Sequence, residues 1–150
     1  MTIMTPVNAI DFIPHEKPMV FIDHILEVGD NFAIVELFIT PELMFCEEYG
    51  LPTWTSIELM AQTVSLYAGS QGQKLGQTPK IGFLLGTRKL ILPVAYFELG
   101  KIVKIKVERQ YLHEGLGQFS CEILYEAHTI QAMLSVYEPV EASESKFGNI

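Results

Sequence analysis

Residues Pro52 to Gly69, PTWTSIELMAQTVSLYAG, are the strongest indication of the fold of this chain. The segment is apolar almost all the way round at helical spacing, which predicts a helix buried inside the protein. One stripe is polar, and its members share one face of the helix because they are three or four residues apart: Thr55, Glu58, Gln62 and Ser65. A buried carboxylate is costly unless it is paired, hydrogen-bonded or used, so this face is the first candidate for chemistry.

A structural role for Glu58 is the alternative. Thr55 and Glu58 have the spacing of a capping box, in which two side chains satisfy the free N–H groups of a helix start. Pro52 and the hydroxyl residues after it are also typical of a helix start. Gln62 favours the chemical role, because a capping box needs no second polar group one turn further along.

Length and composition predict one soluble globular domain. The chain has 150 residues, of which 49% are apolar and 19% charged, and it is long enough to bury a proper core. We expect a single domain over residues 1–150, with its core at about 12–139 and a polar tail after it.

The chain reads as a reduced, cytoplasmic protein. No apolar run reaches the roughly 18 to 20 residues that cross a bilayer, and the N-terminus lacks the pattern of a signal peptide. Cys46 and Cys121 have no metal-type spacing and are too few for a disulfide scaffold. We therefore expect no membrane span, no metal and no cofactor.

The charge pattern argues against nucleic acid and leaves two interpretations of a basic segment. The formal net charge is −8, which disfavours general binding to nucleic acids. Eight of the ten basic residues nevertheless fall in one segment, where they form either solvated strand faces or a docking patch: Lys74, Lys80, Arg88, Lys89, Lys101, Lys104, Lys106 and Arg109.

The remaining pattern predicts an α+β protein with the hotdog fold, a curved antiparallel sheet wrapped around one long central helix. Two strands are expected before the helix, at 19–28 and 32–40, and about four after residue 81. Glycine and polar residues from Gly69 to Thr78 indicate a loop after the helix. Since one such sheet leaves an edge open, we expect dimers.

Three pieces of sequence carry a family resemblance. PHEKPMVFID, at 14–23, has a Pro-His followed by an apolar strand and Asp, and GFLLGTRKLILPV, at 82–94, follows the central helix. Pro52, Glu58 and Gln62 match the proline, acidic residue and glutamine of that helix in one family. From about residue 13 to 139 the chain resembles the 3-hydroxyacyl-(acyl carrier protein) dehydratases of bacterial fatty acid synthesis. On IELMAQ (57–62) and GFLLGTR (82–88), it is most similar to the dehydratase-like proteins of aryl polyene pigment clusters.

The resemblance implies a mechanism and a set of site residues. In the family, a His removes the C2 proton of a 3-hydroxyacyl thioester, and an acidic residue protonates the departing C3 hydroxyl. Helix-start N–H groups hold the thioester oxygen, as the positive end of a helix can. Glu58 is accordingly the expected acid, and the expected substrate-binding residues are Pro52, Thr53, Trp54 and Gln62.

The sequence indicates the general base less directly than the acid. The family's catalytic His lies in the loop before the central helix, but the corresponding segment here, ELMFCEEYGLPT at 42–53, contains no His. His15 matches a family position and is the first candidate. His24, which alternation points inward, and His113 and His128, at or near turns, are weaker candidates.

Three functions follow from the resemblance. The first is a 3-hydroxyacyl thioester dehydratase, with Glu58 as acid and His15 or a partner's His as base. The second is a non-catalytic subunit that forms a heterodimer with an active dehydratase, and the third is an acyl thioesterase. The implied partners are an acyl carrier protein, docking at Arg88 and Lys89, and a second hotdog subunit in a homodimer or heterodimer.

Overall fold

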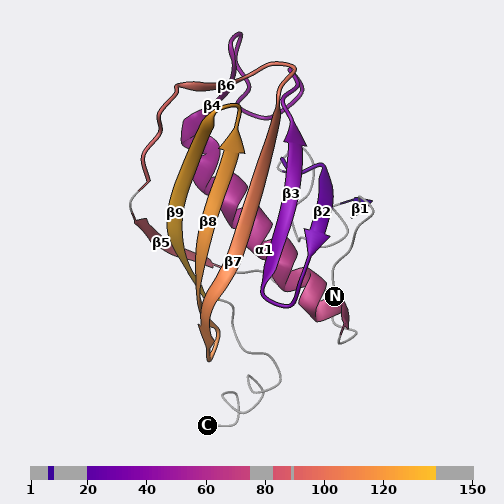
Figure 1. Ribbon diagram of the computed structural model, residues 1–150, viewed down its shortest axis with the longest axis vertical. Helices are drawn as coiled ribbons and strands as arrows, with labels where there is room; N and C mark the ends of the chain where they lie inside the picture. The colour runs from indigo at the N-terminus through magenta and orange to yellow at the C-terminus, as the bar shows by residue number, and fades with distance from the viewer. Residues whose placement is uncertain (1–6, 9–19, 75–82, 89, 138–150) are drawn as a thin grey trace.

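The computed structural model describes residues 7–8, 20–74, 83–88 and 90–137. A long helix, α1 (Ser56–Lys74), crosses one face of an antiparallel sheet, and a short 3-10 helix at Thr53–Thr55 leads into it (Figure 1). This is the arrangement that the polar and apolar periodicities of the sequence predict.

The main sheet has seven strands in the order β1-β2-β3-β7-β8-β9-β5, and all neighbours are antiparallel. Its first part contains β1 (Val7–Asn8), β2 (His24–Val28) and β3 (Phe32–Phe38). Its second part contains β7 (Ile102–His113), β8 (Leu116–Tyr125), β9 (His128–Tyr137) and β5 (Phe83–Arg88). Strand β5 lies at one edge of this sheet, with its partner β9 on one side.

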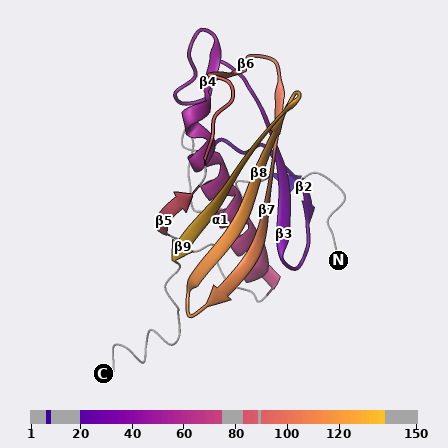
Figure 2. The ribbon, with the colours of Figure 1, turned by 60° about the vertical axis from the view of Figure 1, so that its left-hand side comes forward.

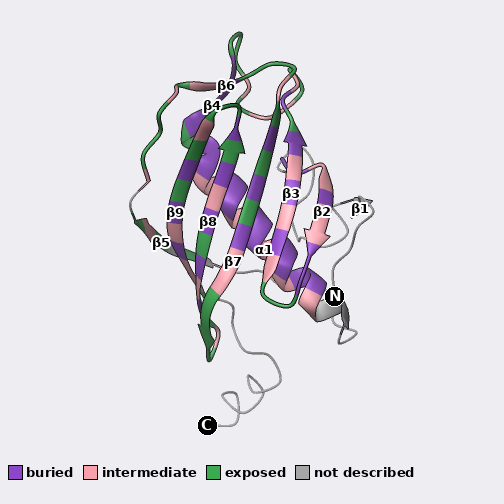
Figure 3. Cartoon of the chain, viewed as in Figure 1, coloured by how far each residue is buried: buried purple, intermediate pink, exposed green. Residues whose placement is uncertain are grey.

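The core lies between α1 and the inner face of the sheet. Buried and exposed positions alternate along the long strands, as Figure 3 shows for β7 and β8. Val103, Ile105 and Val107 are fully buried, whereas Lys104 and Lys106 are exposed, as the alternation predicts. The turned view in Figure 2 shows that the sheet is twisted and that α1 lies against its inner face.

The helix is longer than the sequence predicts. It continues through Gly69 to Lys74, where we expected a loop. Two contacts anchor its last turns to the β2–β3 turn: the Tyr67 hydroxyl donates to the Asp30 carbonyl at 2.5 Å, and the Gln71 amide donates to the Gly29 carbonyl at 3.2 Å. Tertiary contacts of this kind override the weak helix propensity of glycine.

A second, two-stranded sheet lies at the end of the molecule where α1 begins (Figure 1). Strand β4 (Gly50–Pro52) pairs with β6 (Tyr96–Glu98). Gly50 has φ +135°, and a Cβ there would lie 2.1 Å from the Phe97 carbonyl oxygen. Only glycine permits so close an approach, and this pairing fixes where the central helix starts.

Candidate functional site

The start of α1 is tied to the segment before β6. Thr53 is buried, its N–H donates to the Ala95 carbonyl at 2.9 Å, and its hydroxyl donates to the Val94 carbonyl at 2.6 Å. Pro52 is buried beside it at the end of β4. These two of the four expected substrate-binding residues therefore lie at the helix start and hold it in place; their contact with a substrate stays a prediction.

Two members of the polar stripe, Glu58 and Gln62, form a hydrogen-bonded relay with the Phe21 backbone N–H. Gln62 is fully buried, and its Nε2 donates to Glu58 Oε2 at 2.9 Å. Its Oε1 accepts from the Phe21 backbone N–H at 3.0 Å. The amide orientation is thus fixed from both ends, and the half-buried Glu58 carboxylate in the first turn of α1 is held by a buried donor.

Among the described residues, no hydrogen bond has the Thr55 hydroxyl as the acceptor that a capping box requires. This hydroxyl donates to the Pro52 carbonyl at 2.7 Å, in a buried position. Further along the stripe, the Ser65 Oγ is buried and has no hydrogen-bond partner among the described residues. The stripe therefore brings Glu58 and Gln62 together and leaves the other two members outside the relay.

An aromatic stack leads from the relay to the surface. Trp54 is 56% exposed and packs against Phe45, with ring centroids 5.2 Å apart. Phe45 in turn stacks on the buried Phe21, whose N–H joins the relay, at 6.3 Å. Phe45 has φ +70°, an unusual conformation for a residue with a large side chain, and such positions are concentrated at functional sites.

The candidate bases are dispersed. His15, the first choice from sequence, lies outside the described residues. His24 lies on the outer side of β2, where its Nδ1 is 3.6 Å from Glu36 Oε2, and not inward as predicted. A β-bulge between Ile25 and Glu27 breaks the alternation on which that prediction depended.

The other two histidines lie at opposite ends of the long strands. His113 ends β7 beside the β7–β8 turn, and its Nε2 is 3.6 Å from Glu114 Oε1. His128 begins β9 and stacks on Tyr125, with ring centroids 6.5 Å apart.

Of the two expected docking residues, Arg88 is exposed at the end of the edge strand β5, and Lys89 lies outside the described residues.

Burial raises the pKa of the Cys121 thiol to about 12, so this cysteine stays protonated and does not fit a nucleophile. Within the described ranges, no group of three or more His, Cys, Asp or Glu side chains could hold a metal ion. The same residues contain no helix long and apolar enough to cross a membrane.

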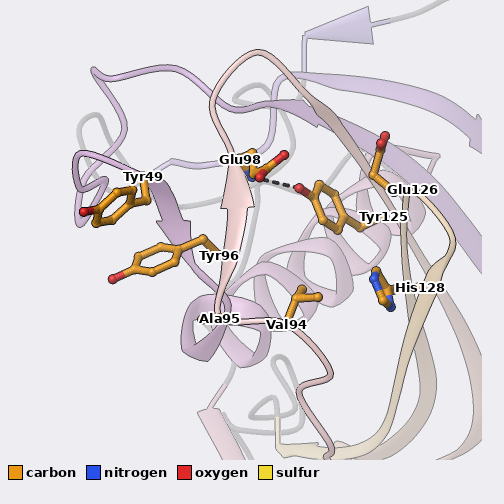
Figure 4. A pocket seen from close by; sticks show the side chains of 8 residues that line it. All are labelled: Tyr49, Val94, Ala95, Tyr96, Glu98, Tyr125, Glu126 and His128. Carbon is orange, nitrogen blue, oxygen red and sulfur yellow. Dashed lines mark hydrogen bonds between the residues drawn. The ribbon is translucent and has the colours of Figure 1, made fainter.

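Sequence reasoning missed a cavity of about 470 Å³ beside β6. Figure 4 shows Tyr49 and Tyr96 on one side of it and Tyr125 and His128 on the other. Its walls come from the loop before β4, from β6 and from the β8–β9 turn. No local pattern predicts this cavity, because distant segments build it.

A curved antiparallel sheet around one central helix, with a carboxylate in the first turn of that helix, defines a hotdog-fold protein. A profile of the ApeP-like family, described as ApeP dehydratase, matches residues 7–146, and the chain therefore belongs to that family. This confirms the resemblance to the dehydratase-like proteins of aryl polyene clusters. Among curated protein sequences, none matches the chain.

Solved structures share the fold. The dehydratase heterocomplex ApeI:P from Xenorhabdus doucetiae aligns with a TM-score of 0.82 and 24% identity, over 96% of this chain and 99% of that chain. A hypothetical thioesterase protein with coenzyme A from Streptococcus pneumoniae TIGR4 aligns with a TM-score of 0.59 and 15% identity, over 76% and 83%. The PaaI protein of Escherichia coli, from the phenylacetic acid degradation operon, aligns with a TM-score of 0.57 and 15% identity, over 79% and 80%.

Proposed function

We propose that this chain is a subunit of a 3-hydroxyacyl thioester dehydratase and supplies Glu58 as the general acid. The observation that carries the proposal is the relay from the Phe21 N–H through the buried Gln62 amide to the Glu58 carboxylate. An amide fixed by a backbone group holds the carboxylate in one orientation, which proton transfer to a reacting atom requires. Ordinary helix capping needs no such buried support.

The reaction assigned to the site is an elimination of water. A base removes the proton at C2 of the 3-hydroxyacyl thioester, and a double bond forms between C2 and C3. Glu58, in its carboxylic acid form, gives its proton to the C3 hydroxyl, which leaves as water, and Glu58 is left as the carboxylate. One proton leaves C2 and another arrives at the C3 hydroxyl. The acid and the base must therefore both reach the same bound substrate.

The base comes either from His15 or from a second hotdog subunit. The loop before α1 contains no His, and among the described strands β5 lies at a sheet edge, through which another subunit can continue the sheet. The similar structure from Xenorhabdus doucetiae is a heterocomplex, which supports an assembly of two different hotdog chains here as well. The substrate would arrive on an acyl carrier protein, whose acidic surface suits the exposed Arg88 and its neighbour Lys89.

The test compares Glu58→Gln with Glu122→Gln. Glu122 lies on the outer side of β8, where its carboxylate accepts from Gln131 at 3.3 Å, so its change removes the same charge far from the relay. Dehydration of a 3-hydroxyacyl thioester is measured with the chain alone and with a second hotdog protein from the same gene cluster. We expect the assembled wild type and Glu122→Gln to be active and Glu58→Gln to lose about 100-fold or more in rate.

Two outcomes would contradict the assignment. Full turnover by a folded Glu58→Gln assembly would make this chain a non-catalytic subunit. Release of free thiol from the thioester, lost in Glu58→Gln, would make it a thioesterase. Activity of the chain without a partner that His15→Ala abolishes would assign the base to His15.

A further inference from the structure

The cavity beside β6 is distinct from the Glu58 relay, since neither Glu58 nor Gln62 lines it. Its volume, about 470 Å³, is within the range of small-molecule sites. One wall is a corner of two tyrosines: the rings of Tyr49 and Tyr96 have centroids 5.7 Å apart and are inclined at 54°. Both side chains belong to the lining of the cavity (Figure 4).

The fold holds this corner in place. The Tyr96 hydroxyl donates to Glu47 Oε1 at 2.8 Å, and this hydrogen bond is the first cause of a raised pKa for the Tyr96 phenol, which therefore stays neutral. Tyr49 immediately precedes Gly50, whose close approach to Phe97 joins β4 to β6.

The opposite wall offers a buried ring and a free carboxylate. Tyr125 is buried, packs edge-on against Phe97 with centroids 5.1 Å apart, and its hydroxyl accepts from the Glu98 N–H at 3.0 Å. The Glu98 carboxylate itself is exposed and has no partner among the described residues. His128 lies beside Tyr125 as a further flat ring.

The cavity carries an excess of negative charge. Glu126 is neutralised by Lys101, whose Nζ lies 3.3 Å from its Oε1, and Glu47 is engaged by the Tyr96 hydroxyl. Glu98 remains, next to aromatic faces that are themselves negative at their centres. An anion would be repelled, and a purely apolar ligand would leave the Glu98 carboxylate desolvated.

From this geometry, we propose that the cavity is a binding site for an organic ammonium group. The cation would contact the faces of Tyr49 and Tyr96 and lie near the Glu98 carboxylate, while its hydrocarbon part packs on Val94 and Ala95. Cation–π attraction and one unpaired carboxylate are the chemistry by which proteins recognise such groups. The ammonium belongs either to a free small molecule or to a lysine side chain, and the test distinguishes the two.

Binding is measured on the full chain by NMR titration with choline and with its neutral isostere 3,3-dimethyl-1-butanol. We expect choline to bind more tightly by roughly 5- to 30-fold, because only the cation is attracted by two ring faces. N-acetyl-lysine methylamide is titrated in parallel, with N-acetyl-norleucine methylamide as its neutral control. If choline binds more tightly than the lysine derivative, the site is assigned to a free ammonium compound. If the lysine derivative binds more tightly than choline, the site is assigned to a protein side chain.

Matched variants locate the site. Tyr49→Leu and Glu98→Gln should each weaken ammonium binding by about two- to fivefold. Tyr111→Leu and Glu122→Gln remove an exposed ring and a carboxylate elsewhere on the sheet, and they should leave binding unchanged. Equal affinity for cation and isostere, or equal weakening by the control variants, would overturn the proposal.

Discussion

Replacing Gln62 by leucine tests the relay at the centre of the proposed site. Leucine has a similar volume, so the change removes polar contacts without opening a large cavity. It leaves the Phe21 N–H, in a residue only 1% exposed, without its acceptor, and the Glu58 carboxylate without the buried donor at 2.9 Å. An orphaned buried N–H costs about 1 to 3 kcal/mol, and a hydrogen bond to a charged group contributes about 1.5 to 3 kcal/mol.

These terms are partly offset because leucine is more favourable than an amide in an apolar surrounding. We expect Gln62→Leu to lower the free energy of unfolding by about 2 to 4 kcal/mol. Gln62→Glu should also destabilise at pH 7, since it keeps an acceptor for the Phe21 N–H but places a second carboxylate against Glu58. Part of that loss should return in acid, where one proton is shared between the two carboxyl groups.

The assay is urea unfolding followed by circular dichroism, at one fixed protein concentration because assembly contributes to stability. Ser65→Ala is the matched control, one turn further along the same stripe, where the buried Oγ has no described partner. Its removal should change stability by less than about 1 kcal/mol. A loss below about 0.5 kcal/mol for Gln62→Leu would refute the view that the amide holds Glu58 in position.

Three further predictions concern other parts of the chain. Arg88→Glu combined with Lys89→Glu should slow association with the acyl carrier protein and reduce its salt dependence in stopped-flow experiments; equal losses with free thioesters would instead indicate damage to the site. Because burial raises the pKa of both thiols, and that of Cys121 to about 12, Ellman's reagent at pH 8 should label the part-exposed Cys46 first and Cys121 only on unfolding. Light scattering at micromolar concentration should give a dimer burying at least about 1,000 Å², alone or with a second hotdog chain; a monomer under both conditions would contradict this.

The local elements were predictable where periodicity is strong. Alternation along β7 placed Val103, Ile105 and Val107 in the core, where all three are fully buried. The end of α1 was not predictable, since contacts of Tyr67 and Gln71 with the β2–β3 turn keep the helix intact beyond Gly69. A glycine that predicts the end of a helix is overridden where contacts with distant residues stabilise the helix.

Spacing within single elements was enough to predict the buried central helix, its polar stripe and the antiparallel strands that follow. The roles of the polar residues depend instead on contacts between distant segments. Gln62 meets the backbone of Phe21, 41 positions away, and Tyr49 meets Tyr96 through the pairing of β4 with β6. Such contacts form when folding brings distant segments together, and periodicity within a segment carries no information about which segment it will meet.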